Sequence, residues 1–261
     1  MLELARYQAR RHLKGAVYLA VGLSLLGTMY VATFPSVSSG IDLDQFIEQM
    51  PEIFRELFNI STMNTVEGFL AAELYSIGWI LLFGMYIAYG GATLIAEDVE
   101  RGRMDLLLSL PVSRTRVVVE KFAALLVPVG LANLLVPVVV FAGTALVGYP
   151  VDPASLAAVH LLSVPYLLAC AAVGLLLSVL VSRASVAQRG ALVAVFALFL
   201  IESLTIVAGY DWLGAVAPMR YYDPTAILVD GSYDLLGSAV LLAGATLLLA
   251  ASASYFRYRD V

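Results

Sequence analysis

The sequence contains few of the residues that carry enzyme chemistry. Only one of its 261 residues is cysteine, and only two are histidine. A lone Cys170 excludes a disulfide within the chain and a cysteine-based metal site, and a small buried apolar role is its simplest interpretation. His12 and His160 lie far apart in the sequence, and neither belongs to a cluster with metal-ligand spacing. We therefore expect no metal site.

Signatures of ATP-hydrolysing and hydrolytic enzymes are missing as well. No Gly-Lys dipeptide occurs anywhere, which excludes the phosphate-binding loop G-x-x-x-x-G-K-[ST]. The patterns H-E-x-x-H and G-x-S-x-G are also absent. The chain is not expected to bind ATP by this route, or to carry a catalytic constellation or a cofactor of its own.

Charge is scarce, whereas long apolar runs are abundant. Charged residues make up 13% of the chain, hydrophobic residues 61%, and the mean hydropathy is +0.89. A membrane-spanning helix needs about 20 mostly apolar residues. Six such runs occur: Gly15–Phe34, Ala71–Ala96, Phe122–Gly148, Leu156–Val181, Gly190–Gly209 and Leu235–Phe256. Because lipid offers the backbone no hydrogen-bond partners, each run must be helical, and we predict an all-α integral membrane protein with six transmembrane helices.

Basic residues indicate how the chain is oriented. With the N-terminus placed inside, all Lys and Arg residues except Arg55 and Arg220 lie on the inner side. This bias predicts that both termini are cytoplasmic. Since membrane topology accounts for the basic residues, nucleic acid is not an expected partner. The first apolar run is too long for a cleaved signal and is followed by Phe34-Pro35, which favours an uncleaved anchor.

Three segments outside the apolar runs have patterns of their own. Residues 1–14 are basic with interleaved apolar side chains, and form either an amphipathic interface helix on the inner membrane surface or a short topogenic tail. Residues 35–70 form an outer amphipathic loop, in which Pro51 splits the part between 41 and 60 into two short helices with an acidic face. Its alternative is a plain solvated loop. Residues 210–234 contain Trp212, Tyr221 and Tyr222, and form short re-entrant helices or an interfacial loop at the outer side.

A few polar or small residues lie inside the apolar runs. Glu202 is the one acidic residue well within a run, so it is either a translocation-path residue or a partner in a helix–helix hydrogen bond. Asn133 is better explained by bonding between helices. The glycines of the second run suggest close helix packing; they are Gly78, Gly84, Gly90 and Gly91.

The segment 97–121 concentrates charge between the second and third runs. It reads E-D-V-E-R-G-R-M-D-L-L-L-S-L-P-V-S-R-T-R-V-V-V-E-K. Pro111 would end a helix that begins near Glu97, and Ser113 could cap the next helix. Met104, Leu107 and Leu108 then share one face, which could fit a groove on a cytoplasmic protein. The alternative is a solvated loop whose leucines rest on the membrane surface.

This segment resembles the cytoplasmic motif of ATP-binding-cassette (ABC) type-2 exporter permeases. That motif has Glu-x-Gly, a leucine-rich run, Pro-[Val/Leu]-Ser-Arg and a lysine at the third span. The matching residues are Glu100, Gly102, Leu106–Leu108, Pro111, Ser113, Arg114 and Lys121. Arg103 stands where the family usually has threonine. The six spans, the large first outer loop and the cytoplasmic termini extend the resemblance over the chain, and the region Pro218–Asp223 adds weakly to it.

The resemblance implies partners and roles. Two copies of a cytosolic ABC ATPase would hold ATP and Mg, and a second permease chain, identical or different, would complete the pathway within the membrane lipid. The segment would be the coupling helix, with ATPase-coupling residues Glu97, Glu100, Arg101, Gly102, Met104, Leu107, Leu108, Pro111, Ser113 and Arg114. Residues 1–14 would be the interface helix. The first and fifth spans would meet near the dimer axis, which places Glu202 close to the path.

We therefore predict a permease subunit of an ABC transporter in the cell membrane, an exporter and not itself an enzyme. A membrane scaffold or assembly factor without transport is the alternative, and an intramembrane enzyme using Glu202 or His160 is a third. A mostly apolar pathway is compatible with a lipid, peptide, drug, ion or polysaccharide precursor as substrate.

Overall fold

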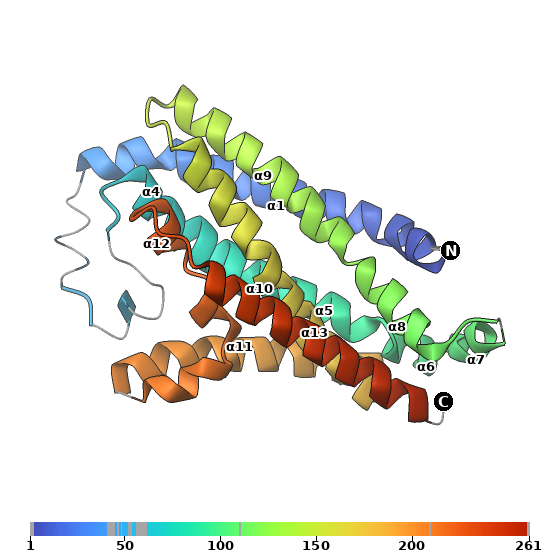
Figure 1. The fold of residues 1–261 in the computed structure, drawn as a ribbon. Helices are drawn as coiled ribbons and strands as arrows, with labels where there is room; N and C mark the ends of the chain where they lie inside the picture. Colours follow the sequence, from blue (N-terminus) through green and yellow to red (C-terminus); the bar gives the residue numbers. More distant parts are fainter. Residues whose placement is uncertain are drawn as a thin grey trace.

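The computed structural model describes residues 3–40, 45, 47, 49–51, 54–55, 62–109, 111–208 and 210–259, and the regular elements among them are all helical (Figure 1). Six helical stretches are long and apolar enough to cross a membrane: Arg6–Gly40, Val66–Thr93, Arg114–Leu146, Pro153–Leu180, Ala184–Leu204 and Leu235–Tyr258. The all-helical class and the six spans are thus confirmed. Most of the amphipathic pair expected between 41 and 60 lies outside the described residues.

The first span is one helix, α1 (Glu3–Gly40). Residues 3–14 form its first turns and continue without a break into the span. Gly15 does not end the helix, because one glycine in a helix interior costs only about 1 kcal/mol. Pro35 lies inside α1 as well. Proline removes only one hydrogen bond near the end of the helix, and this loss does not end it. The helix α1 extends beyond the boundary expected at Phe34.

The second span is built from three consecutive pieces. These are α4 (Val66–Leu70), the π-helix η1 (Ala71–Phe83) and α5 (Gly84–Thr93). In η1, ring centroids are 6.1 Å apart for Tyr75 and Trp79, and 4.9 Å apart for Trp79 and Phe83. The wider turn of a π-helix brings residues four apart close to one line, so these buried rings form a column inside the bundle.

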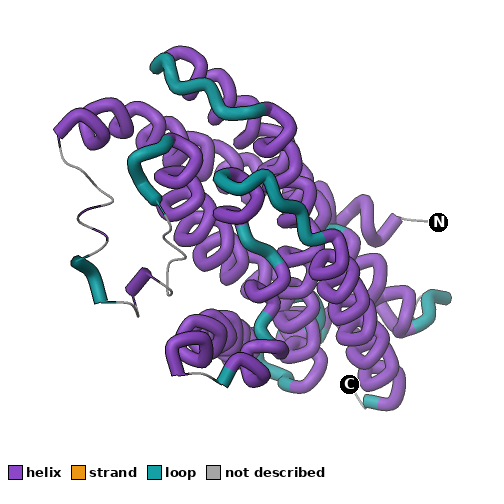
Figure 2. Tube along the Cα trace, turned by 60° about the vertical axis from the view of Figure 1, so that its left-hand side comes forward, coloured by secondary structure: helices purple, strands orange, loops and turns teal. Residues whose placement is uncertain are grey.

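The remaining spans surround a central helix. The third span joins α8 (Arg114–Ala123) to α9 (Leu126–Leu146), and it is followed by α10 (Pro153–Leu180), α11 (Ala184–Ala208) and α13 (Leu235–Tyr258). The central helix α10 packs against α5 and α13 (Figures 1 and 2). The helix α1 packs along α9, and α11 packs against α5. A Cβ atom on Gly91 would overlap the carbonyl of Ala171, and one on Gly174 would overlap that of Ala88. Close packing is therefore confirmed at Gly91, whereas Gly174 had given no signal.

The bundle has two distinct ends. Both chain termini lie at one end, which we call the terminal end, together with α6 (Ala96–Glu100) and α7 (Arg103–Leu108) (Figure 1). The opposite end, which we call the loop end, carries α4 and α12 (Pro224–Leu228). The 3-10 helices η2 (Asp211–Val216) and η3 (Pro218–Tyr221) connect α11 to α12. The segment 210–234 is thus a series of short helices.

Candidate functional site: a charged joint at the terminal end

The segment 97–121 does not form the single helix expected before Pro111. Gly102 has a φ of +63°, a left-handed conformation that ends α6 and starts α7 in a new direction. A second break precedes α6. There the Ser178 hydroxyl of α10 accepts hydrogen bonds from the N–H groups of Ile95 and Ala96, both 2.9 Å long. Ser113 caps α8 as expected, because its hydroxyl accepts a 3.2 Å hydrogen bond from the N–H of Arg116.

A buried ion pair ties α6 to α8. The carboxylate of Asp98, 4% exposed, meets the ammonium of Lys121, 2% exposed, and also pairs with Arg103. Lys121 donates a second hydrogen bond, 2.7 Å long, to the carbonyl of Leu94. Burial alone would raise the pKa of Asp98, but the charges of Lys121 and Arg103 and the hydrogen bonds they donate hold it below its ordinary value. Asp98 is therefore ionised and holds the start of α6 against the third span.

Glu97 connects α6 to the first span. One of its oxygens lies 3.0 Å from Arg11 of α1, 3.1 Å from Arg101 and 3.3 Å from Arg103. These arginines are partly exposed, so each pair alone contributes little, and the network fixes geometry more than stability. A cavity of about 150 Å³ lies beside the network; its polar lining residues are Gln8, Arg11, His12, Thr93, Glu97, Asp98 and Lys121.

Glu100 and Arg114 reach the two remaining helices at this end. The Glu100 carboxylate accepts a 2.9 Å hydrogen bond from the N–H of Ala184, and so caps the start of α11. Arg114 donates to the carbonyls of Phe256 and Arg259 at the end of α13, and its guanidinium lies 5.7 Å from the centroid of the Phe256 ring. We call these contacts of α6 and α8 with α1, α11 and α13, together with the Asp98–Lys121 pair, the charged joint.

Three apolar residues of α7 share one face, as expected, and that face points inward. Met104 is 1% exposed, and Leu107 and Leu108 pack partly buried against the core of the chain itself. Leu106, by contrast, is 71% exposed. The exposed residues of α6, α7 and the turns beside them are Glu100, Arg101, Gly102, Asp105, Leu106, Ser109 and Pro111. Residues two apart lie on different faces of a helix, so the spacing in the sequence already separates Leu106 from Met104. This was the available signal for the outward position of Leu106.

Glu202 lies far from the joint, in α11 towards the loop end. Its side chain is buried, and Oε2 lies 3.8 Å from Nη1 of Arg220 in η3. A Cβ atom on Gly214 would overlap this carboxylate, so the glycine makes room for the pair. The sequence had not connected Arg220 to Glu202; the available signal was that Arg220 is one of two basic residues expected on the outer side.

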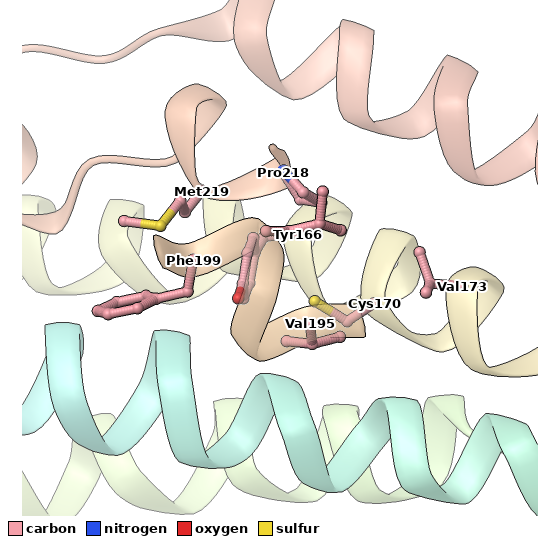
Figure 3. Close-up of a pocket in the computed structure, with 8 residues that line it drawn as sticks. Tyr166, Cys170, Val173, Val195, Phe199, Pro218 and Met219 are labelled. Carbon is pink, nitrogen blue, oxygen red and sulfur yellow. The ribbon is translucent and has the colours of Figure 1, made fainter. Parts of the chain in front are cut away.

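The loop that carries Arg220 is packed into the bundle. Pro218 and Met219 of η3 lie beside Tyr166 and Cys170 of α10 and next to Phe199 of α11 (Figure 3). The void left between them is about 10 Å³, roughly the space of one water molecule. Cys170 is a buried free thiol in this contact, and the described residues contain no group of three or more His, Cys, Asp or Glu able to hold a metal ion.

Six candidate spans that are joined by a network of charges at one end define a multi-pass membrane protein. The family comparison gives its kind, because the model described as an ABC-2 family transporter protein matches residues 12–255. The chain belongs to this family and is a transmembrane permease subunit of an ABC-2 transporter. The family resemblance of the sequence is thus confirmed. Neither the curated proteins nor the solved structures gave a match.

Proposed function

We propose that the charged joint couples this permease to a cytosolic ABC ATPase, and that ATP-driven closure of two ATPase subunits moves the spans to export a substrate. The observation that carries the proposal is the distribution of the acidic residues of α6. Glu97 pairs with α1, Asp98 with α8, and Glu100 with the first residue of α11. A displacement of α6 therefore acts directly on three spans.

The partner would supply the chemistry that this chain lacks. ATP and Mg would bind to the ATPase, and each of two permease chains would present one joint to one ATPase subunit. In the apolar stretches of α1, α11 and α13, 28% of the residues are buried within the single chain, which leaves large apolar faces for a second permease chain or for lipid. A homodimer and a heterodimer both fit these faces.

The proposal requires the terminal end to be cytoplasmic, as the positive-inside bias predicts. Cysteine labelling tests this directly, because the native Cys170 is buried. Ser109→Cys, between α7 and Pro111, should react with a membrane-impermeant maleimide only after the cells are opened. Ser232→Cys, an exposed position at the loop end, should react in intact cells. The reverse pattern would refute the orientation and, with it, the coupling role.

Leu106 is the position at which to test contact with the ATPase. Burying a leucine in an interface stabilises it by about 1.5–3 kcal/mol, so Leu106→Asp should weaken the complex about 10- to 100-fold. Leu236→Asp is the matched control, because Leu236 is 76% exposed but lies in the first turn of α13 at the loop end. The measurement is copurification with a cognate cytosolic ABC ATPase, together with permease-stimulated ATP hydrolysis.

Three outcomes are informative. Loss of binding for Leu106→Asp alone supports the proposal. Equal behaviour of the two variants would show that α7 is not the docking site. If the wild-type chain neither binds the ATPase nor stimulates it, a scaffold or assembly role would replace transport.

We further propose that Glu202 and Arg220 lie on the translocation path near the loop end, with residues 1–14 acting as the interface helix. Glu202 belongs to the span expected at the dimer axis, and the loop bearing Arg220 closes over the α10–α11 contact. Opening of the path would require this loop to move, and the pair is the charged contact through which it is held to α11.

A further inference from the structure

A groove between α9 and α10 is separate from both the charged joint and the Glu202 pair. Its volume is about 390 Å³, within the range of about 300–1,000 Å³ found for small-molecule sites. Val138 and Leu161, 65% and 69% exposed, form its outer wall, whereas His160 beneath them is 2% exposed. Both helices belong to candidate membrane spans, so the groove opens towards lipid hydrocarbon.

The deep side of the groove rests on a connected polar network. The Oδ1 atom of Asn133 lies 3.3 Å from His160 Nδ1 and accepts a 3.1 Å hydrogen bond from Ser163. Because an amide oxygen can only accept, Nδ1 of His160 donates to Asn133, and Nε2 lies 3.0 Å from the Tyr75 hydroxyl. His160 is therefore fixed in orientation through both of its ring nitrogens.

Asn133 itself keeps hydrogen-bonding capacity. Its Nδ2 atom donates one hydrogen to the carbonyl of Val129 over 2.8 Å, and a primary amide has a second hydrogen to give. Asn133 lines the groove, so this second hydrogen is available to a ligand that carries an acceptor.

Two prolines add acceptors at the same place. Pro137 inside α9 cannot donate to the carbonyl of Asn133, and Pro165 inside α10 cannot donate to that of Leu161. Both of these carbonyls belong to residues that line the groove. In the hydrocarbon region no water replaces the missing N–H donors, so carbonyls freed in this way favour a donor from another source.

We propose that this groove binds an uncharged membrane lipid with a hydroxyl group at its polar end, such as a long-chain alcohol or a diacylglycerol. A hydroxyl both accepts and donates, so it matches the spare hydrogen of Asn133 and the freed carbonyls. The described lining residues include no charged side chain, so a phosphate or ammonium headgroup would be unfavourable there. The lipid chain lies along Val138, Phe141 and Leu161. This site does not depend on the ATPase-coupling role.

The test uses the full chain in phosphatidylcholine nanodiscs with two photoactivatable probes, a diazirine long-chain alcohol and its methyl ether. The ether keeps the acceptor and loses the donor. Mass spectrometry should show that the alcohol labels residues 133–161 about fivefold more than the ether does, the effect of one hydrogen bond. Both probes should label the exposed face of α13 equally. Equal labelling of the groove by the two probes would overturn the proposal.

Two variants locate the site. Ala157→Trp fills the groove from its exposed wall and should lower labelling of residues 133–161 by the alcohol to the level seen on α13. Ala243→Trp makes the same change on the exposed face of α13 and should leave groove labelling unchanged. Asn133→Leu removes the amide donor that the oxygen of either probe can use, so it should lower labelling of the groove by both probes and leave the preference for the alcohol in place. Labelling that survives Ala157→Trp, or a groove that crosslinks only to a second permease chain, would refute lipid binding.

Discussion

At the terminal end of the bundle, the acidic side chains of α6 meet groups of other helices; at the loop end, three aspartates meet the N-termini of their own helices. Asp98 pairs with Lys121, and Glu97 with Arg11. At the loop end, by contrast, Asp152 accepts from the N–H of Ser155 over 2.7 Å, and Asp234 from that of Gly237 over 2.7 Å. Asp223 caps α12 in the same way.

Helix starts explain the position of these three aspartates at the loop end. The helices α10, α12 and α13 begin at the loop end, where their first N–H groups lack partners within the helix and a nearby anion is favourable. The acidic character of the loop end thus has, at three positions, a local structural cause. At the terminal end the same residue type links one helix to another. Contacts that transmit a displacement between spans are therefore concentrated at the terminal end.

The largest effect is expected from breaking the buried pair of the charged joint. Lys121→Met removes the ammonium partner of the buried Asp98 carboxylate, which keeps only Arg103 as a cation, and should lower the free energy of unfolding by about 3 kcal/mol, the low end for a broken buried pair. Thermal unfolding of the purified chain in detergent measures this. Asp98→Asn combined with Lys121→Met should recover a large part of the loss. A double variant as unstable as Lys121→Met would show that the lysine acts by packing rather than by charge.

The pH dependence of stability provides a second view of the same pair. In the folded chain, Lys121 and Arg103 hold the pKa of Asp98 below its ordinary value, so the folded state favours the ionised carboxylate. The stability that Asp98 contributes is fully present at pH values above the pKa of the unfolded state. It is lost as the pH falls below that pKa and then through the lower pKa of the folded state. Acid unfolding of the wild type should therefore include a component below about pH 4 that Asp98→Asn lacks. Parallel acid transitions would argue against this assignment.

Ser178 should show the next largest effect. Ser178→Ala leaves the N–H groups of Ile95 and Ala96 buried without their acceptor, which should destabilise the chain by about 1–3 kcal/mol. Ser252→Ala is the matched control, because Ser252 is equally buried and its hydroxyl has no hydrogen-bond partner among the described residues. Equal melting temperatures for the two variants would remove the capping role assigned to Ser178.

These positions also show what could be predicted from the sequence. The spans were predictable because lipid permits only helices, and the last one was expected at Leu235–Phe256 and found at Leu235–Tyr258. The break at Gly102 was missed because Pro111 appeared to be the stop signal, although a glycine with positive φ is an equally good helix terminator. The π-helix η1 has no local sequence signal that we can name.

The candidate site was predictable in its location but not in its contacts. The motif residues Glu100, Arg114 and Lys121 were identified, and each contacts a different helix. Their partners depend on tertiary packing: Asp98 and Lys121 meet across a chain reversal, and Glu100 meets a backbone N–H that no side-chain pattern announces. From the sequence, Met104 was expected on the face that meets a partner. In the structure Met104 is buried against the core of the chain, so the opposite face of α7 points outward.

A smaller and local effect is expected at the loop end. Asp234→Ala removes the cap of α13 and should cost about 1 kcal/mol of stability. Asp230→Ala provides the comparison, since Asp230 precedes a glycine turn and caps none of the described helices. Melting curves of both variants test this. A loss above that of Ser178→Ala would contradict the view that acids at the loop end act within single helices.

The smallest change in stability is expected at the Glu202–Arg220 pair, although its functional effect should be larger. The two groups are 3.8 Å apart and Arg220 is partly exposed, so Glu202→Gln should lower the free energy of unfolding by less than about 1 kcal/mol. If the pair lies on the translocation path, the same variant should still reduce permease-stimulated ATP hydrolysis. Because the fold is retained, such a reduction cannot come from unfolding. Unchanged hydrolysis and transport would leave the pair a structural contact, and the terminal end would then be the one charged region with a role in coupling.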